Sequence, residues 1–173
     1  MELLKRFTTG DAEAFETLFQ QYQKEVYGWI MRIVRNPTIA EELTVETFWR
    51  VYRSRARFDP TRSFGAWTRR IAANLALDYL KRVRNEEEFL ENRSQVSLPD
   101  PAIQQDTRRK IQQAFNQLPP KLRLTATLAL VEEIPYEEIA ESLGIPVGTV
   151  KSRVFRAIRL LRLKLKQFGE DYE

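Results

Sequence analysis

Residues 136–156 read YEEIAESLGIPVGTVKSRVFR, and this stretch decides the fold class of the second half of the chain. It has the layout of a helix-turn-helix, in which the small Ala140 lies where a second helix must approach closely and Gly144 serves the turn. Three valines then recur at the spacing of one helix face: Val147, Val150 and Val154. The pattern predicts two helices, residues 136–143 and 147–167.

The second of these helices has an outer face with basic residues and no acidic residue. Phe155 shares that face although it is apolar. Ordinary surface helices mix both charge signs, so a basic face suggests a strongly negative partner. At the N-terminal end of such a helix, Arg pairs with guanine and an aromatic ring contacts thymine in the major groove. We expect DNA contact from Lys151, Ser152, Arg153, Phe155, Arg156 and Arg159. For Arg162, Lys164 and Lys166 the alternative is favoured, namely a solvated basic helix or nonspecific attraction to phosphates.

Net charge divides the chain into three parts. The 173 residues are 43% hydrophobic and 30% charged with a net charge of +4, a composition typical of a folded protein. Residues 1–84 hold 15 basic and 10 acidic residues, residues 85–106 hold 1 and 6, and residues 107–173 hold 12 and 8. We therefore expect two small basic domains joined by an acidic flexible linker. Alternatively, the acids of the linker compete with a polyanion for the basic faces, or thread through a basic channel in a partner.

Helical periodicity without strand alternation predicts an all-α fold. Asp11 is the expected N-cap of the first long helix, and Asn36-Pro37 ends that helix. The helices expected before the helix-turn-helix are residues 11–35, 39–53, 63–84, 107–117 and 121–131.

The chain has no Cys and no His. Disulfides, thiolate nucleophiles, imidazole bases and the usual zinc sites are therefore excluded, and we expect no cofactor, no metal and no enzymatic activity. No apolar run approaches the ~20 residues that span a bilayer, and the start, MELLKRFTTGD, lacks the apolar core of a signal peptide. We expect a cytoplasmic protein without membrane insertion.

Residues 58–82, FDPTRSFGAWTRRIAANLALDYLKR, interleave aromatic and basic side chains. This mixture is typical of a surface that stacks unpaired bases and holds their backbone. Phe64 and Trp67 also have the spacing of core residues, so both interpretations remain open for them. Asn74 is a poor helix former among apolar neighbours, so it is either a satisfied, half-buried amide or a group that reads a base.

Three stretches together resemble the bacterial RNA polymerase sigma factors, most closely the two-domain extracytoplasmic-function (ECF) type. They are AEELTVETFWRVYR at residues 40–53, the segment 64–82 and the segment 118–157 that contains the helix-turn-helix. They occur in the order of the family and cover nearly the whole chain. The resemblance implies a promoter-specificity subunit whose first domain, residues 1–84, docks on core polymerase and captures and melts the minus-ten element. The second domain, residues 107–173, would read the minus-thirty-five element.

The resemblance also implies roles for individual residues. Residues 40–53 match the helix that binds the polymerase clamp, with Val45 and Glu42 departing from the Gln and Asp that are frequent in the family. The clamp-binding residues implied are Glu42, Glu46, Phe48 and Arg50.

The minus-ten residues implied are Arg62, Trp67, Arg69, Arg70 and Asn74. Five of the residues already assigned to DNA contact match the family's recognition helix: Lys151, Ser152, Arg153, Phe155 and Arg156. The linker, residues 85–106, would thread toward the active-site and RNA-exit channels. The implied partners are core polymerase, through its clamp and flap surfaces, promoter DNA and an anti-sigma factor.

Two other function classes fit less well. A helix-turn-helix regulator of the two-component output type would need a phosphorylatable or ligand-binding first domain. Residues 1–84 show neither an α/β pattern with an Asp at a strand end nor a glycine-rich phosphate loop. An enzyme acting on nucleic acid would need clustered carboxylates for metal ions, and the densest acidic cluster, residues 86–88, lies in the expected linker.

Overall fold

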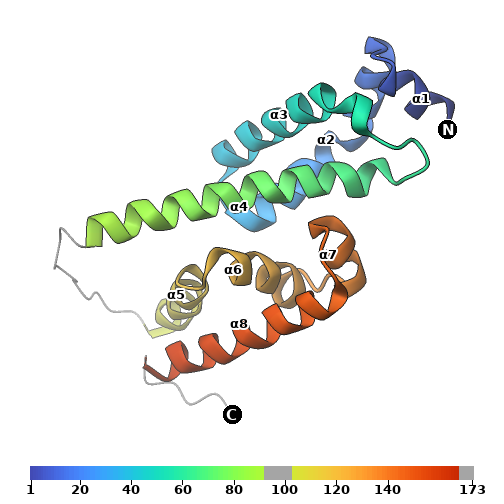
Figure 1. The fold of residues 1–173 in the computed structure, drawn as a ribbon. Helices are drawn as coiled ribbons and strands as arrows, with labels where there is room; N and C mark the ends of the chain where they lie inside the picture. The colour runs from blue at the N-terminus through green and yellow to red at the C-terminus, as the bar shows by residue number, and fades with distance from the viewer. Residues whose placement is uncertain (92–102, 168–173) are drawn as a thin grey trace.

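The computed structural model describes residues 1–91 and 103–167, and what the sequence predicts for residues 92–102 and 168–173 lies outside the described residues. Every regular element in the described ranges is helical, which confirms the all-α prediction. The long helix α4 (Phe64–Glu91) runs through the middle of the molecule. Helices α2 and α3 lie on one side of it and α5–α8 on the other (Figure 1).

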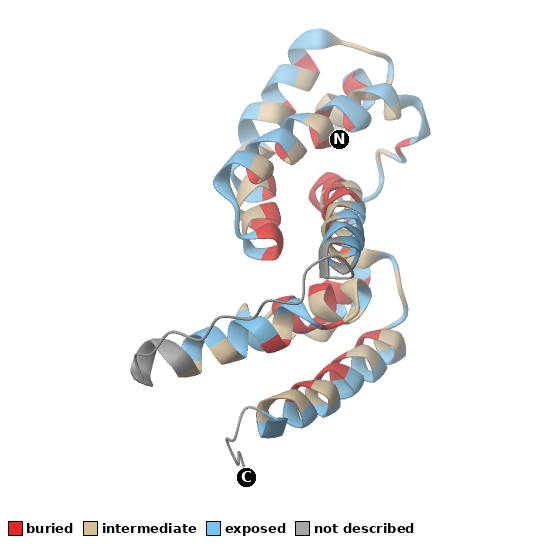
Figure 2. Cartoon of the chain, turned by 90° about the vertical axis from the view of Figure 1, so that its left-hand side faces the viewer, coloured by how far each residue is buried: buried red, intermediate tan, exposed pale blue. Residues whose placement is uncertain are grey.

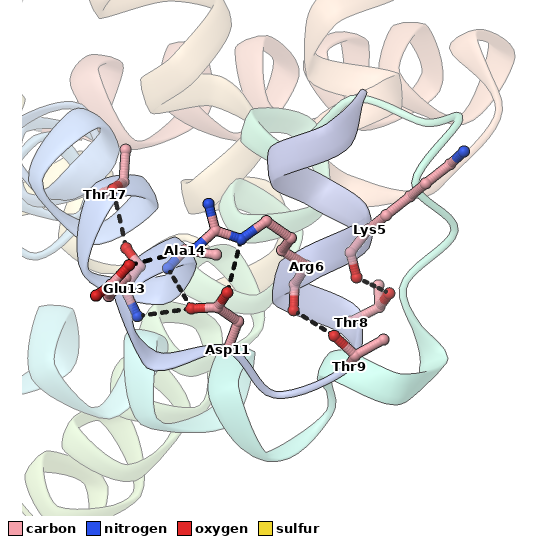
Figure 3. Close-up of polar contacts among 8 residues, drawn as sticks. All are labelled: Lys5, Arg6, Thr8, Thr9, Asp11, Glu13, Ala14 and Thr17. Carbon is pink, nitrogen blue, oxygen red and sulfur yellow. Dashed lines mark hydrogen bonds and ion pairs between the residues drawn. The ribbon is translucent and has the colours of Figure 1, made fainter.

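The chain begins with a short helix that was not predicted, α1 (Glu2–Thr8), followed by α2 (Ala12–Val34). Asp11 caps α2 as predicted, because its carboxylate accepts hydrogen bonds from the backbone N–H groups of Glu13 and Ala14. Arg6 of α1 donates to the same carboxylate at 2.6 Å (Figure 3). These hydrogen bonds hold the pKa of Asp11 below its ordinary value, and the bond from Arg6 contributes most. The cap therefore also fixes α1 against α2.

Helix α3 (Pro37–Arg53) starts two residues earlier than predicted, with Asn36 as its N-cap and Pro37 in its first turn. A short 3₁₀ turn, η1 (Arg55–Arg57), then leads to α4. The prediction that this third long helix ends near Arg84 was wrong. It continues to Glu91 and takes up the first part of the expected linker.

The extension of α4 has a simple physical explanation. Asn85, Glu86 and Glu87 are all exposed, and the sequence here shows no apolar periodicity. Glu is nevertheless a good helix former. Arg82 and Glu86 also lie one turn apart, with their side-chain N and O atoms 4.0 Å from each other. An acidic composition was thus mistaken for the end of a helix.

The second half begins with α5 (Ile103–Asn116), four residues before the predicted start. It continues through α6 (Pro120–Ala126) and a π-helical segment, η2 (Thr127–Val131). The two helices of the predicted helix-turn-helix follow within the expected bounds: α7 (Tyr136–Leu143) and α8 (Val147–Gln167).

The two halves pack against each other through a shared apolar core. Buried residues of α2 and α4, such as Ile30 and Ala76, belong to the same cluster as Leu128 of η2 and Ile139 of α7. Helix α4 packs on α2 and α3 and also on α6 and α7. Buried positions accordingly occur on helices on both sides of α4 (Figure 2). The structure therefore describes a closed arrangement of the two halves.

Candidate nucleic-acid interface

The turn of the helix-turn-helix is fixed by the backbone around Gly144. The Gly144 N–H donates to the carbonyl of Glu141 at 3.2 Å, and the Ile145 N–H donates to that of Ala140 at 3.0 Å. This pair of bonds is the Schellman motif, which needs a left-handed residue after the helix. Gly144 supplies it with a φ of 65°. The turn sets the direction in which α8 leaves α7.

Helix α8 buries one stripe and exposes the face that the sequence predicts for DNA. The buried stripe consists of Val150, Val154, Ala157 and Leu161. Lys151, Ser152, Phe155, Arg156 and Arg159 are exposed, and Phe155 keeps 70% of its surface accessible. Arg153 is half-buried at the flank of this face, and burial lowers the pKa of its guanidinium. The predicted DNA residues thus share one side of the helix, with Arg153 at its edge.

An apolar ring in water has no stabilising contact on its exposed face, so the exposure of Phe155 indicates a binding face. Neighbouring Arg156 forms no ion pair with the described residues, and residues 147–167 contain no acidic residue. The hydroxyl of Ser152 donates to the Thr149 carbonyl at 3.0 Å and keeps its lone pairs free to accept. The face can therefore offer an aromatic edge, a cation and a hydroxyl acceptor to a polyanion.

The predicted minus-ten residues lie on α4 and on the loop before it. Asn74 and Arg70 are exposed, and Arg62 is exposed with a contact to Asp59 at 3.7 Å. Because Asn74 is exposed, the alternative interpretation of this residue as a satisfied, half-buried amide is excluded. Trp67 is half-buried at the rim of an aromatic cluster, with its ring centroid 4.7 Å from that of Phe58. Phe64, in contrast, is 3% exposed and belongs to the core.

Arg69 differs from the other predicted minus-ten residues because its side chain is only 18% exposed. It forms an ion pair of 2.5 Å with Glu25 of α2 and donates a hydrogen bond of 3.2 Å to the Ser142 hydroxyl of α7. Glu138 of α7 lies 3.9 Å away, and the guanidinium lies 5.7 Å from the centroid of the Trp29 ring. In this arrangement Arg69 joins the two halves and does not face solvent.

Arg70 lies against the turn of the helix-turn-helix. A Cβ atom added to Gly144 would come within 2.5 Å of the Arg70 guanidinium carbon. Arg69 therefore contacts α7, the first helix of the helix-turn-helix, and the adjacent Arg70 contacts its turn. Their neighbours in the predicted minus-ten set, Asn74 and Arg62, remain accessible.

The predicted polymerase-binding helix α3 presents a mixed surface. Glu42 and Arg50 are exposed, and Glu46, which is half-buried, accepts a hydrogen bond from Arg50 at 2.7 Å. Phe48 is 3% exposed, and its ring packs edge-on against Phe19 of α2 at 4.9 Å between centroids. Phe48 is therefore a core residue that packs beneath the exposed surface of α3.

Beside these residues lies an apolar groove of about 510 Å³ between α2 and α3. Its lining residues are Ala12, Phe15, Phe19, Val45, Phe48, Trp49 and Tyr52. Val45 and Trp49 are 69% and 54% exposed. Trp49 was not among the candidate residues predicted from the sequence. The signal was available, since Val45 and Trp49 are four residues apart and share a face that the core stripe of α3 does not use.

Comparisons with known proteins agree with this geometry. The family model for Sigma-70 region 2 matches residues 18–86, and that for Sigma-70, region 4 matches residues 108–161. RNA polymerase sigma factor CarQ of Myxococcus xanthus is 36% identical over 163 residues, which cover 92% of this chain and 93% of CarQ. ECF RNA polymerase sigma factor SigW of Bacillus subtilis is 33% identical over 177 residues, which cover 94% and 95% of the two chains.

The chain belongs to the ECF family of RNA polymerase sigma factors. It serves promoter-specific transcription, and sigma factors as a family are non-enzymatic transcription initiation factors. The fold is shared with CnrH, solved in complex with the cytosolic domain of CnrY, at a TM-score of 0.60 and 22% identity over 95% of this chain and 96% of that one. It is also shared with the sigma factor RpoE of Bartonella quintana, solved with the anti-sigma factor NepR, at a TM-score of 0.55 and 21% identity over 90% and 98%.

Neither a metal cluster nor a membrane-spanning helix occurs in the described part of the sigma factor. Within residues 1–91 and 103–167 there is no group of three or more carboxylates that could hold a metal ion. Over the same part of the chain, no helix has both the length and the apolar character to cross a membrane.

Proposed function

We propose that this sigma factor contacts the promoter and polymerase through three separate surfaces. The outer face of α8 reads the minus-thirty-five element, the exposed side of α4 captures and melts the minus-ten element, and the groove between α2 and α3 docks on the polymerase clamp. The observation that carries the proposal is the face of α8, where Phe155 is 70% exposed beside Arg156 and no acidic residue occurs in residues 147–167.

The minus-thirty-five contact follows from the geometry of a helix-turn-helix. Its second helix lies in the major groove and presents N-terminal residues to the bases. Arg156 supplies the bidentate donors that guanine accepts, and Phe155 supplies an apolar contact for a thymine methyl group. Lys151 and Arg153, at the flanks, are suited to phosphates, which position the helix without reading sequence.

The minus-ten contact uses an unpaired strand. Extruding a base costs a few kcal/mol of lost stacking and pairing, so the protein must offset that cost with a pocket and with phosphate contacts. Asn74 offers both a donor and an acceptor on the exposed side of α4. Trp67 at the rim of the aromatic cluster offers a stacking surface, and Arg62 offers a cation. Opening is driven by binding free energy and needs no nucleotide hydrolysis by this chain.

Docking on the polymerase clamp uses apolar contact as well as charge. Val45 stands where many members of the family have Gln, so a hydrogen bond from that position is missing. The exposed surfaces of Val45 and Trp49 replace it with apolar area, which anchors protein interfaces well when it is buried. Glu42 and Arg50 then form the polar rim. The second domain docks in turn on the polymerase flap.

Promoter binding requires the closed arrangement to open, since Arg69 and Arg70 contact α7 and its turn. Core polymerase, by holding the two halves at separate sites, drives this opening. An anti-sigma factor is a further proposed partner, which binds the free chain and keeps it from polymerase. The relatedness in fold to RpoE of Bartonella quintana, whose solved complex contains an anti-sigma factor, supports this partner.

The proposal is tested by adding the purified chain to bacterial core polymerase and transcribing a library with randomised promoter positions. Capture of core polymerase, followed by initiation from templates that share two sequence elements, is the expected result. Specific binding to duplex DNA without capture of core polymerase would instead identify a helix-turn-helix regulator. Initiation without any shared upstream element would contradict the role of α8.

A further inference from the structure

A cavity of about 320 Å³ lies where the C-terminal end of α2 meets α5, α6 and η2. None of the three proposed binding surfaces includes it. Its volume is at the lower end of the range for small-molecule pockets, ~300–1,000 Å³. The residues that line it are Ile33, Arg35, Arg108, Ile111, Gln112, Phe115, Asn116, Arg123, Thr127 and Val131.

Three arginines from different elements line this cavity: Arg35 follows α2, Arg108 is on α5 and Arg123 is on α6. Among the side chains that the structure describes, none of these three guanidinium groups forms an ion pair with a carboxylate. Burial lowers the pKa of Arg123, and the charge of Arg35 lowers it further, while Glu87 on α4 and Tyr79 oppose the effect. The cavity thus concentrates positive charge that the neighbouring carboxylates do not pair directly.

The remaining walls of the cavity combine four apolar side chains with the polar Gln112, Asn116 and Thr127. Ile33 is buried at the end of α2, while Ile111, Phe115 and Val131 present side chains from α5 and η2. Gln112 and Asn116 add amide donors on the face of α5. A ligand that fits must therefore combine a strongly negative group with an apolar body.

We propose that this interdomain cavity binds a small organic phosphate. A phosphate monoester carries up to two negative charges and three terminal oxygens, and so engages three guanidinium groups better than a carboxylate with one charge and two oxygens. All three cations are Arg, whose planar donors match phosphate oxygens in pairs. The apolar body of the ligand lies against Ile111 and Phe115.

The position of the cavity gives the ligand a regulatory effect. Ile33 and Arg35 come from the first half of the chain, whereas the other lining residues come from the second half. The complete cavity exists only while the halves are packed together. A ligand that binds one of two conformations shifts the equilibrium toward it. The organic phosphate therefore stabilises the closed arrangement, in which Arg69 is held by Glu25 and Ser142.

Binding is tested on the free full-length chain with phenyl phosphate as the probe and inorganic phosphate for comparison, at constant ionic strength. Titration calorimetry measures affinity, and thermal unfolding measures stabilisation. Phenyl phosphate at ten times its Kd is expected to raise Tm by on the order of 3 °C, and to bind more tightly than inorganic phosphate because its ring contacts the apolar walls.

Arg108→Gln is the test variant, and Arg109→Gln is its matched control, because the next residue on α5 is an exposed Arg that does not line the cavity. Arg108→Gln is expected to weaken phenyl phosphate binding at least about tenfold, whereas Arg109→Gln leaves it unchanged. Arg156→Gln, on the face of α8, also leaves it unchanged.

Three results would overturn the inference. They are the absence of any Tm shift or binding heat with phenyl phosphate, an equal loss of affinity in Arg108→Gln and Arg109→Gln, and a loss of affinity in Arg156→Gln. The second result would show general attraction of anions to a basic protein, and the third would place the anion on α8. None of these measurements involves polymerase or a promoter, so their failure is separate from any failure of the proposed function.

Discussion

The guanidinium of Arg69 donates a hydrogen bond to the hydroxyl of Ser142, 73 residues further along the chain, at 3.2 Å. The same guanidinium is paired with Glu25. A single side chain of α4 therefore holds an acid of α2 and a hydroxyl of α7, the first helix of the helix-turn-helix. Arg69, which the family resemblance assigns to promoter DNA, therefore also links the two halves of the free protein.

Arg69→Ala is expected to open the closed arrangement. It removes the cation that pairs Glu25 and leaves the buried Ser142 hydroxyl without that donor, a loss of on the order of 1–3 kcal/mol. Small-angle X-ray scattering should show a larger radius of gyration than in the original protein. Arg62→Ala is the control, because Arg62 is exposed and contacts only nearby Asp59 among the described residues. Equal radii for both variants would show that Arg69 does not hold the halves together.

Gly144→Ala tests the turn that α4 contacts. Alanine at a φ of 65° costs about 1–2 kcal/mol, and its Cβ would also displace the end of the exposed, flexible Arg70 side chain at a small further cost. We expect a lower Tm and increased proteolysis between the halves. Gly148→Ala is the matched control, because nothing lies within 4 Å of the added Cβ in the first turn of α8, and it should be neutral or stabilising by up to ~1 kcal/mol. A Gly144→Ala protein as stable as the original would contradict this account.

Features that depend on neighbours in the sequence were predictable. The cap at Asp11, the break at Asn36-Pro37 and the helix-turn-helix all follow from residues within one or two helical turns. The outward position of Phe155 followed from the same local periodicity. Such features are decided by local hydrogen bonds and by side-chain spacing, which a sequence displays directly.

Features that depend on distant partners were not predictable. The partners of Arg69 are 44 and 73 residues away, so no local pattern indicates that this cation is covered. The predicted length of α4 was also too short, because residues 85–87 are exposed and show no apolar periodicity that would mark them as helical. The cavity between the halves needs Arg35 and Arg108 to meet in space, which only the packing of the halves decides.

Trp49→Ala tests the groove between α2 and α3. Trp49 is 54% exposed, so truncation should change stability by less than about 1 kcal/mol while weakening core polymerase binding by about 2 kcal/mol, or roughly 30-fold. Phe48→Ala is the contrasting variant, since Phe48 is 3% exposed and its loss should destabilise the fold by about 3–5 kcal/mol. Affinity for polymerase and urea unfolding are measured on both. Unchanged affinity in Trp49→Ala would remove the groove from the interface.

Asn74→Ala is expected to impair promoter opening more than promoter binding. Its exposed amide on α4 is lost, while every group on α8 is kept. Fluorescence of 2-aminopurine placed in the minus-ten element reports unstacking of the bases, and filter binding reports total affinity. Asn85→Ala is the control, because Asn85 is an exposed Asn further along the same helix. An equal reduction of opening in both variants would show that Asn74 has no specific part in base capture.

Arg156→Ala is expected to alter the preferred bases of the minus-thirty-five element. A lost bidentate contact to guanine reduces discrimination at one position by about 1–3 kcal/mol, or roughly 5- to 150-fold. Arg162→Ala is the control, because Arg162 is exposed further along α8, where only phosphate attraction is expected. That variant should weaken binding to all sequences alike and reduce the dependence of affinity on salt. Selection from a randomised upstream element measures both effects. If the Arg156→Ala protein selects the same bases as the original with uniformly lower affinity, Arg156 contacts phosphate and the base-reading role belongs to another residue on the face of α8.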